Sequence, residues 1–197
     1  MILLSKEALD LIFLQARTHH HWQDKRVPEQ LLHDIYDAMK MGPTSTNASP
    51  LRVVFATSVQ AKEKLKPSLM EANIPQVMAA PVTAIFAYDT TFYEKFDRLS
   101  PHNNAISWFK GDSQKAYALE TARYNAALQT GYFILAARAF GLDCGPMAGF
   151  DASKVDDAFL AGTSWRTSLL CNLGYGDSEK LHPRAQRLSF EEACRVL

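Results

Sequence analysis

The residues of this chain that could carry chemistry form a scattered polar set. They fall where apolar segments end: after the first apolar stretch, in a loop rich in Thr, Ser and Asn, in a Gly-rich turn and in a basic tail. Singly, each has an ordinary structural explanation, since an Arg after a helix is usually solvated and a Pro-Thr-Ser run commonly forms a cap or turn. The set comprises Arg17, Thr18, the loop 44–49, Asn73, Gly149, Arg184 and Arg187.

Motifs for several common sites do not occur in the sequence. It contains no GxGxxG or GxxxxGK[ST] pattern, and no HExxH, EF-hand or GxSxG pattern. The run His19-His20-His21 resembles metal ligands only superficially, because ligands on a helix need i, i+4 spacing, so we predict a solvated loop and no metal. Gly176-Asp177-Ser178 leaves a serine hydrolase as a weak alternative to an ordinary turn.

Length and composition are typical of an ordinary globular protein. The 197 residues include 21 Lys and Arg against 21 Asp and Glu, so the formal net charge is zero. This balance disfavours a broad nucleic-acid or anionic-membrane binder, and the length predicts one domain over residues 1–197. Three separated cysteines without a CxxC pair indicate reduced thiols in the cytoplasm, and no leader or membrane-spanning stretch is expected.

The elements that must position the polar set are read from apolar periodicity, caps and breaks. Largely apolar runs predict strands at 52–57, 82–88 and 168–173, and 144–150 is expected to be a tight Gly/Pro segment. Residues 100–113 are expected to be irregular. Helices are predicted from Ser5 to about Ala16, from Pro28 to about Gly42, at 61–65, 75–78, 115–140 and 154–160, and after Ser189. The expected class is a mixed α/β (α+β) domain.

The order and spacing of these segments resemble the FMN-dependent nitroreductase family from about Leu11 to the C-terminus. The segment 42–50 resembles the family's Pro-Ser-Ser-x-Asn-x-Gln-Pro loop, and 145–151 resembles its Pro-x-Glu-Gly-Phe-Asp turn. Asn73, nine residues before a strand, is similar to the family's flavin-contacting Asn. Segments 16–19, 174–178 and 187–193 resemble the malonic semialdehyde reductase branch, whose members are labelled NADH dehydrogenase/NAD(P)H nitroreductase.

The resemblance implies a mainly antiparallel sheet flanked by helices, an intertwined homodimer, and FMN at the subunit interface with NADH or NADPH as co-substrate. Four residues, with His20 as a partial substitute for a further basic residue, would hold the FMN phosphate: Arg17, Thr18, Arg184 and Arg187. Asn73 would meet the pyrimidine edge of the ring, and the turn at Ala148 and Gly149 would bring a backbone N–H close to flavin N5. Pro43, Thr44 and Ser45, with Asn47 in the same loop, would reach the flavin of the partner subunit.

Departures from the family pattern add two expectations. Ala148 stands where the turn usually has Glu, which makes room for an acidic substrate. Ala16 and Ala185 stand where Arg or Lys often occurs, so we predict weaker FMN retention than in typical relatives.

The irregular segment supplies further candidates for the substrate side of the site. His102, Asn103 or Asn104 could hold a substrate carboxylate, with a plain surface loop as the alternative. Trp108 and Phe109 could wall the flavin channel, with core packing as the alternative.

The favoured function is hydride transfer from NAD(P)H through flavin N5 to a small carbonyl acid such as malonic semialdehyde, giving 3-hydroxypropionate. Flavin-centred chemistry requires no catalytic acid–base pair from the protein, and none stands out. The alternatives are a broad nitro- or quinone-reducing enzyme, a flavin-binding dimer without significant turnover, and the Gly-Asp-Ser hydrolase.

Overall fold

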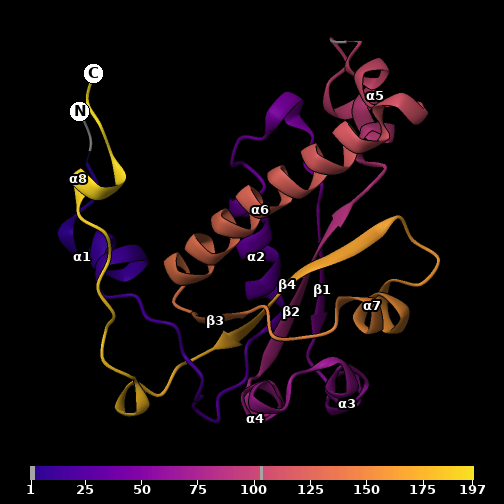
Figure 1. The fold of residues 1–197 in the computed structure, drawn as a ribbon. Helices are drawn as coiled ribbons and strands as arrows, with labels where there is room; N and C mark the ends of the chain where they lie inside the picture. Colours follow the sequence, from indigo (N-terminus) through magenta and orange to yellow (C-terminus); the bar gives the residue numbers. More distant parts are fainter. Residues whose placement is uncertain (1–2, 103) are drawn as a thin grey trace.

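The computed structural model, which describes residues 3–102 and 104–197, is built around an antiparallel β-sheet (Figure 1). The strand order in the described chain is β1-β2-β4-β3, and every neighbouring pair is antiparallel. The strands are β1 (Leu51–Ala56), β2 (Val82–Asp89), β3 (Asp143–Met147) and β4 (Trp165–Gly174). This arrangement confirms the expected mainly antiparallel sheet flanked by helices.

Helices cover both faces of the sheet because residues of β2 alternate between the two sides. Ala84 and Phe86 face α6 (Lys115–Ala139) and α2 (Glu29–Met39), and the Phe86 ring meets Phe133 edge-on at 5.0 Å. Ile85 faces the opposite side, where it packs with residues of α3 (Val59–Leu65), α4 (Ile74–Ala79) and α7 (Ala152–Val155). The long helix α6 runs diagonally across its face of the sheet (Figure 1).

Shorter elements complete the fold. Asp151 caps α7 by accepting from the backbone N–H groups of Ser153 and Lys154. Ser189 heads the last helix with a capping box to Glu192. The remaining α-helices are α1 (Lys6–Leu9), α3 (Val59–Leu65), α4 (Ile74–Ala79), α5 (Phe96–Leu99), α7 (Ala152–Val155) and α8 (Phe190–Ala193). Single helical turns lie at Asp10–Leu14, Ser45–Asn47, Lys66–Ser68, Glu71–Asn73, Phe92–Lys95, Ala105–Trp108, Asp112–Gln114, Asp156–Leu160 and Ser178–Lys180.

Two sequence predictions of local structure were wrong. The tight Gly/Pro segment that we expected at 144–150 begins as strand β3, because Pro146 lies at an edge of the sheet, where its missing N–H leaves no ladder bond unmade. The first helix does not continue to Ala16 as one α-helix. It is the short α1 followed by a π turn at Asp10–Leu14.

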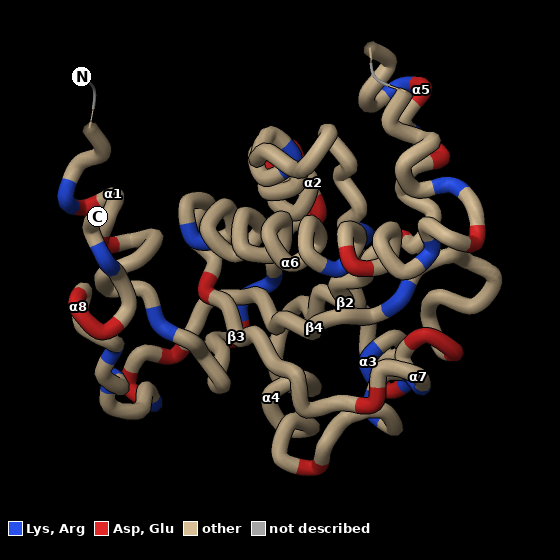
Figure 2. The backbone as a smooth tube through the Cα atoms, turned by 45° about the horizontal axis from the view of Figure 1, so that its top comes forward, with Lys and Arg blue, Asp and Glu red and all other residues tan. Residues whose placement is uncertain are grey.

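The two ends of the chain lie side by side, away from the sheet (Figures 1 and 2). α1 and the segment with α8 form this outlying part, which carries exposed apolar side chains. Exposed large apolar residues of the termini include Leu11, Phe13, Leu14, Leu188 and Phe190.

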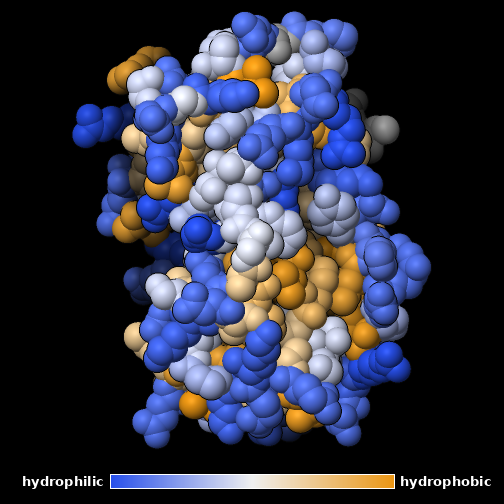
Figure 3. Space-filling view, turned by 90° about the vertical axis from the view of Figure 1, so that its right-hand side faces the viewer, coloured by the Kyte–Doolittle hydropathy of each residue, from blue (hydrophilic) through white to orange (hydrophobic). Residues whose placement is uncertain are grey.

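Another face of the molecule shows a central apolar area among hydrophilic residues (Figure 3). No helix in the described ranges has the length and hydropathy needed to cross a membrane.

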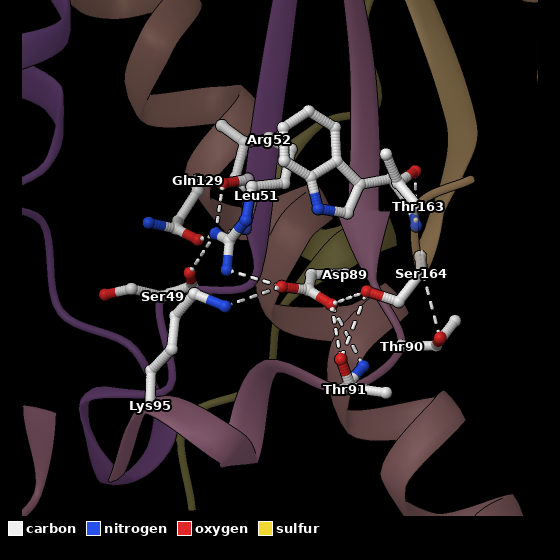
Figure 4. A network of polar contacts seen from close by, with 11 residues as sticks. Ser49, Leu51, Arg52, Asp89, Thr90, Thr91, Lys95, Gln129, Thr163 and Ser164 are labelled. Carbon is white, nitrogen blue, oxygen red and sulfur yellow. Dashed lines mark hydrogen bonds and ion pairs between the residues drawn. The ribbon is translucent and has the colours of Figure 1, made fainter. Parts of the chain in front are cut away.

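One buried carboxylate ties the ends of several elements together (Figure 4). Asp89, at the end of β2, is 1% exposed and forms ion pairs with Arg52 at 2.7 Å and with Lys95 at 3.4 Å. Its other oxygen accepts from Ser164 Oγ at 2.6 Å and from the N–H of Thr91 at 3.0 Å. Because these partners come from β1, the turn before α5 and the loop before β4, the network fixes one end of the sheet.

Candidate functional site

A cavity of about 230 Å³ brings together basic residues from both ends of the chain. The three arginines singled out from the sequence, Arg17, Arg184 and Arg187, all line it. Among its described lining residues Asp177 is the one carboxylate, and it is paired with Lys180 at 3.3 Å. The cavity therefore has an excess of positive charge.

Backbone contacts hold the segment around Arg17 in place. Thr18 forms a parallel bridge with Cys144 of β3, and the N–H of His19 donates to the Cys144 carbonyl at 3.1 Å. The tail is fastened to the same segment, because Arg17 donates to the carbonyl of His182 and Arg184 donates to the carbonyl of Ala16 at 2.9 Å. Residues more than 160 positions apart thus form one wall.

Arg138 is a lining residue that the sequence interpretation missed. It lies in the last turn of α6, and its Nη1 donates to the carbonyl of Ile12 at 3.0 Å. Its Nε is buried and has no hydrogen-bond partner in the described chain. An Arg inside the otherwise apolar stretch 132–142 was the available signal. Ala16 and Ala185, which are uncharged, also line the cavity. Arg138 and Lys180 supply positive charge beside these two positions.

His19 is buried, which corrects the expectation of a solvated histidine loop. Its side chain is 6% exposed, and its Nε2 lies 3.4 Å from a carboxylate oxygen of Asp143. A Cβ added at Gly176 would lie 2.0 Å from Nδ1, so the imidazole fills the space that a larger residue would need. Burial lowers the pKa of His19, and the Asp143 carboxylate opposes this effect. His20 and His21 are exposed as expected.

A second group of predicted residues meets beside the Gly-rich turn. The Asn73 side-chain N–H donates to the carbonyl of Gly149 at 2.8 Å, and its Oδ1 accepts from Gln76 at 2.5 Å. The Oε1 of Gln76 contacts Nδ1 of His20. A Cβ at Gly149 would lie 2.5 Å from Asn73 Nδ2, so the amide packs directly against the glycine. Ala148 is exposed next to this contact.

The loop after α2 lies apart from this group. Pro43 and Asn47 line a different groove, of about 680 Å³. The N–H of Ser45 donates to the side chain of the buried Asn125 at 2.8 Å, and Thr44 Oγ1 accepts from the Ser49 N–H at 3.1 Å. In Figure 1 the loop projects beyond α2, at the end of the molecule away from α4. Within one chain it does not meet Arg17.

The substrate candidates of the irregular segment are dispersed. His102 and Asn104 are exposed, and Trp108 is 52% exposed. Phe109 is buried in an aromatic cluster, with its ring 5.1 Å from that of Phe92, so it follows the alternative of core packing and does not wall a channel. Asn103 lies outside the described residues.

The two weaker sequence alternatives receive no geometric support. Asp177 accepts from the N–H of Glu179 at 3.1 Å and caps the turn Ser178–Lys180, as expected for an ordinary turn. The N–H of Gly176 donates to Asp143 at 2.8 Å. Over residues 3–102 and 104–197, no three His, Cys, Asp or Glu side chains are grouped to hold a metal ion.

Comparison with known proteins identifies the family. The model of the nitroreductase family matches residues 14–175, so the chain belongs to that family. It is 54% identical over 196 residues to a protein of Burkholderia lata, with both chains fully covered, and 50% identical over 194 residues to one of Ralstonia nicotianae, with 98% of each covered. Both relatives carry the provisional name NADH dehydrogenase/NAD(P)H nitroreductase.

Solved structures share the fold at low sequence identity. A protein of Exiguobacterium sibiricum, provisionally assigned as a nitroreductase and solved in complex with FMN, superposes with a TM-score of 0.84 at 15% identity and full coverage of both chains. A provisionally assigned nitroreductase of Bacillus subtilis gives 0.85 at 20% identity, covering 97% of this chain and 99% of that one.

The residues at the cavity fit an FMN phosphate. A phosphate monoester carries nearly two negative charges and binds best to charge-assisted donors, which Arg17, Arg184 and Arg187 provide. The guanidinium of Arg138 adds a further positive charge at the same cavity. Beside the turn, the Asn73 amide keeps one N–H and one oxygen lone pair after its two contacts, which suits the edge of a heterocycle.

Proposed function

We propose that this chain is an FMN-dependent NAD(P)H oxidoreductase that reduces a small carbonyl acid, such as malonic semialdehyde, to the hydroxy acid. Family membership supports flavin chemistry. The observation that carries the assignment to this site is the convergence of Arg17, Arg184 and Arg187 on one cavity. We further propose that the chain acts as one domain in the cytoplasm, in keeping with its three free thiols.

The chain's residues bind and orient, and the bound flavin carries the redox step. When bound, FMN supplies a ring that takes a hydride from NADH or NADPH and passes it to the acceptor. Arg17, Arg184 and Arg187 would neutralise the phosphate, and Thr18 would add a hydroxyl donor beside them. Asn73 would hydrogen-bond the ring edge, with the Gly149 turn packed behind it.

We propose that the working unit is a homodimer in which each site uses both chains. The loop with Pro43, Thr44 and Ser45 lies away from the basic cavity of its own chain, so it is available to the site of a partner. Exposed aromatic side chains on α6, Tyr117 and Tyr124, give this helix an apolar surface that a second copy would cover.

The choice of a carbonyl acid rests on the charge at the turn. Ala148 is exposed and adds no carboxylate next to Gly149, so an anionic acceptor would meet no like charge there. His102 and Asn104 are exposed and free to bind a substrate carboxylate from the irregular segment. Trp108 favours the second candidate, a nitro- or quinone-reducing enzyme, because its half-exposed indole could stack on a planar acceptor.

Anaerobic mixing of the purified, FMN-loaded protein with NADH or NADPH tests the flavin chemistry. We expect the yellow oxidised colour to bleach, and then to return when malonic semialdehyde is added. A colour that persists with both nicotinamides would leave only a flavin-binding dimer.

Comparison of acceptors tests the substrate. The kcat/KM for malonic semialdehyde should exceed that for a nitroaromatic compound and for a quinone. The reverse order would favour the broad reductase.

A further inference from the structure

A continuous chain of side-chain contacts runs from the segment 17–21 to the Gly-rich turn. It passes from His20 through Gln76 and Asn73 to the carbonyl of Gly149. No sequence pattern singles out Gln76. It lies in α4, three residues after Asn73, so the two side chains share one side of the helix start.

The direction of every hydrogen bond in this chain follows from its last member. The Gly149 carbonyl can only accept, so Asn73 must turn its NH₂ group toward it. The Asn73 oxygen then has to accept, which requires the NH₂ group of Gln76 to face it. The Gln76 oxygen is left to accept from His20, which requires a proton on Nδ1. One backbone carbonyl therefore sets the orientation of two amides and the tautomer of one imidazole.

The backbone beneath this chain is held by buried groups. The carbonyl of Gln76 accepts from Nδ2 of Asn172 at 3.2 Å, and Asn172 is fully buried in β4. The Oδ1 of Asn172 in turn accepts from Thr83 Oγ1 of β2 at 2.7 Å. Gln76 is thus anchored to the sheet, and it can hold Asn73 in one orientation.

We propose that Gln76 is a positioning residue for the flavin site, which fixes the Asn73 carboxamide so that its remaining N–H and lone pair face the ring edge in one orientation. This rests on the proposed function, since it needs Asn73 to contact the flavin. Without Gln76, the Asn73 oxygen loses its donor and only the Gly149 carbonyl still orients the amide, so the carboxamide is less firmly held and part of the hydrogen bonding to the ring is lost. His20 positions Gln76 in the same way and links the basic cavity to the turn.

A double-mutant cycle tests this role. Gln76→Leu should weaken FMN binding about five- to tenfold, as expected for loss of one oriented hydrogen bond, and should shift the midpoint potential of the bound flavin. In an Asn73→Ala background the same substitution should change the FMN dissociation constant by less than about twofold, because Gln76 acts through Asn73. FMN fluorescence quenching and potentiometric titration give the two readouts.

Two further variants complete the design. Gln30→Leu is the matched control: Gln30 is an exposed residue of α2 whose amide donates to Asp34 at 2.9 Å, and both readouts should stay at wild-type values. Gln76→Glu keeps the size of the side chain but cannot donate to Asn73 as a carboxylate, and it replaces Gln76→Leu if that variant does not fold.

The outcomes separate this inference from the function on which it rests. The positioning role alone would be overturned if the wild-type protein binds FMN and the Gln76 variants have the same FMN dissociation constant and midpoint potential as wild type. The role would also be overturned if Gln76→Leu weakened FMN binding equally in the wild-type and Asn73→Ala backgrounds, because the effect would then be general destabilisation. A wild-type protein that binds no FMN would overturn the proposed function, and the role of Gln76 with it.

Discussion

Arg138 reaches the basic cavity from α6, whereas the other arginines come from the two ends of the chain. Because Arg138 lines the cavity proposed for the phosphate, Arg138→Met should weaken FMN binding about tenfold or more, since hydrogen bonds to charged groups contribute roughly 1.5–3 kcal/mol. Riboflavin, which lacks the phosphate, should bind equally well to the wild-type protein and to Arg138→Met. Arg166→Met, at an exposed arginine of β4, is the control. Equal losses for FMN and riboflavin would contradict a phosphate contact.

His19 predicts a pH dependence of stability. Burial lowers its pKa in the folded state, while Asp143 raises it, Arg17 and His20 lower it, and Asp177 raises it. As pH falls, His19 therefore binds a proton at a higher pH in the unfolded chain than in the folded chain. The folded state loses stability as pH falls below about 6.5 toward the lowered pKa. We expect the Tm of wild type to drop more between pH 7.5 and 5.5 than that of His19→Asn. Parallel Tm curves would contradict this role of His19.

Individual residues at the cavity were only partly predictable. Arg17 and Arg187 were found because they stand in short motifs that resemble the family, and Arg184 because it lies in the same basic tail as Arg187. Arg138 carried a signal that was not used, since it interrupts the apolar stretch 132–142. Gln76 lies in a helix, where nothing in the sequence separates a lining residue from a solvated one. The burial of His19 depends on the small size of Gly176, more than 150 residues away, and no local pattern reports such a contact.

At the scale of elements, the Asp89 network should control how firmly one end of the sheet is held. Burial alone would raise the pKa of Asp89, but hydrogen bonds from Ser164 and Thr91 and the charges of Arg52 and Lys95 lower it. Its contribution to stability is therefore present above the ordinary carboxyl range and lost as pH falls through the lowered pKa. Asp89→Asn should cost about 3–5 kcal/mol of unfolding free energy, because it leaves Arg52 without its counter-charge.

Denaturant unfolding at pH 7 and pH 3 measures this effect. Asp177→Asn serves as the control, since Asp177 forms its ion pair with Lys180 at the surface. A loss of stability for Asp89→Asn no larger than that of the control would show that the buried pair is not stabilising.

Most elements were predictable because their boundaries are marked by local chemistry. Ser5, Asp151 and Ser189 accept hydrogen bonds at helix starts, and Gly141 ends α6 with a φ of 81°. Strand β3 was not predictable, because Gly145 and Pro146 have low strand propensity and only pairing with β4 makes this segment extended.

At the scale of the whole molecule, the proposal that each site is shared between two chains predicts complementation. Arg17→Met/Arg184→Met would damage the cavity of its own chain, and Ser45→Phe would damage the loop offered to the partner. Random pairing of the two variants should restore about a quarter of the wild-type FMN sites, since half of the dimers are mixed and each has one site with both parts intact. FMN stoichiometry after unfolding and refolding the mixture measures this.

Refolding each variant alone controls for incomplete damage, and light scattering should give the mass of a dimer. A mixture that binds only the average of the two separate variants would mean that each site is built within one chain.

The distribution of the cysteines makes the tail open to selective labelling. Cys144 and Cys171 are buried in the sheet, whereas Cys194 follows α8 and is exposed. A maleimide dye should therefore attach to native protein at one position per chain. Energy transfer between donor- and acceptor-labelled tails would then report whether two chain ends approach each other, and the quenching of either dye by bound flavin would report how near the tail lies to an occupied site.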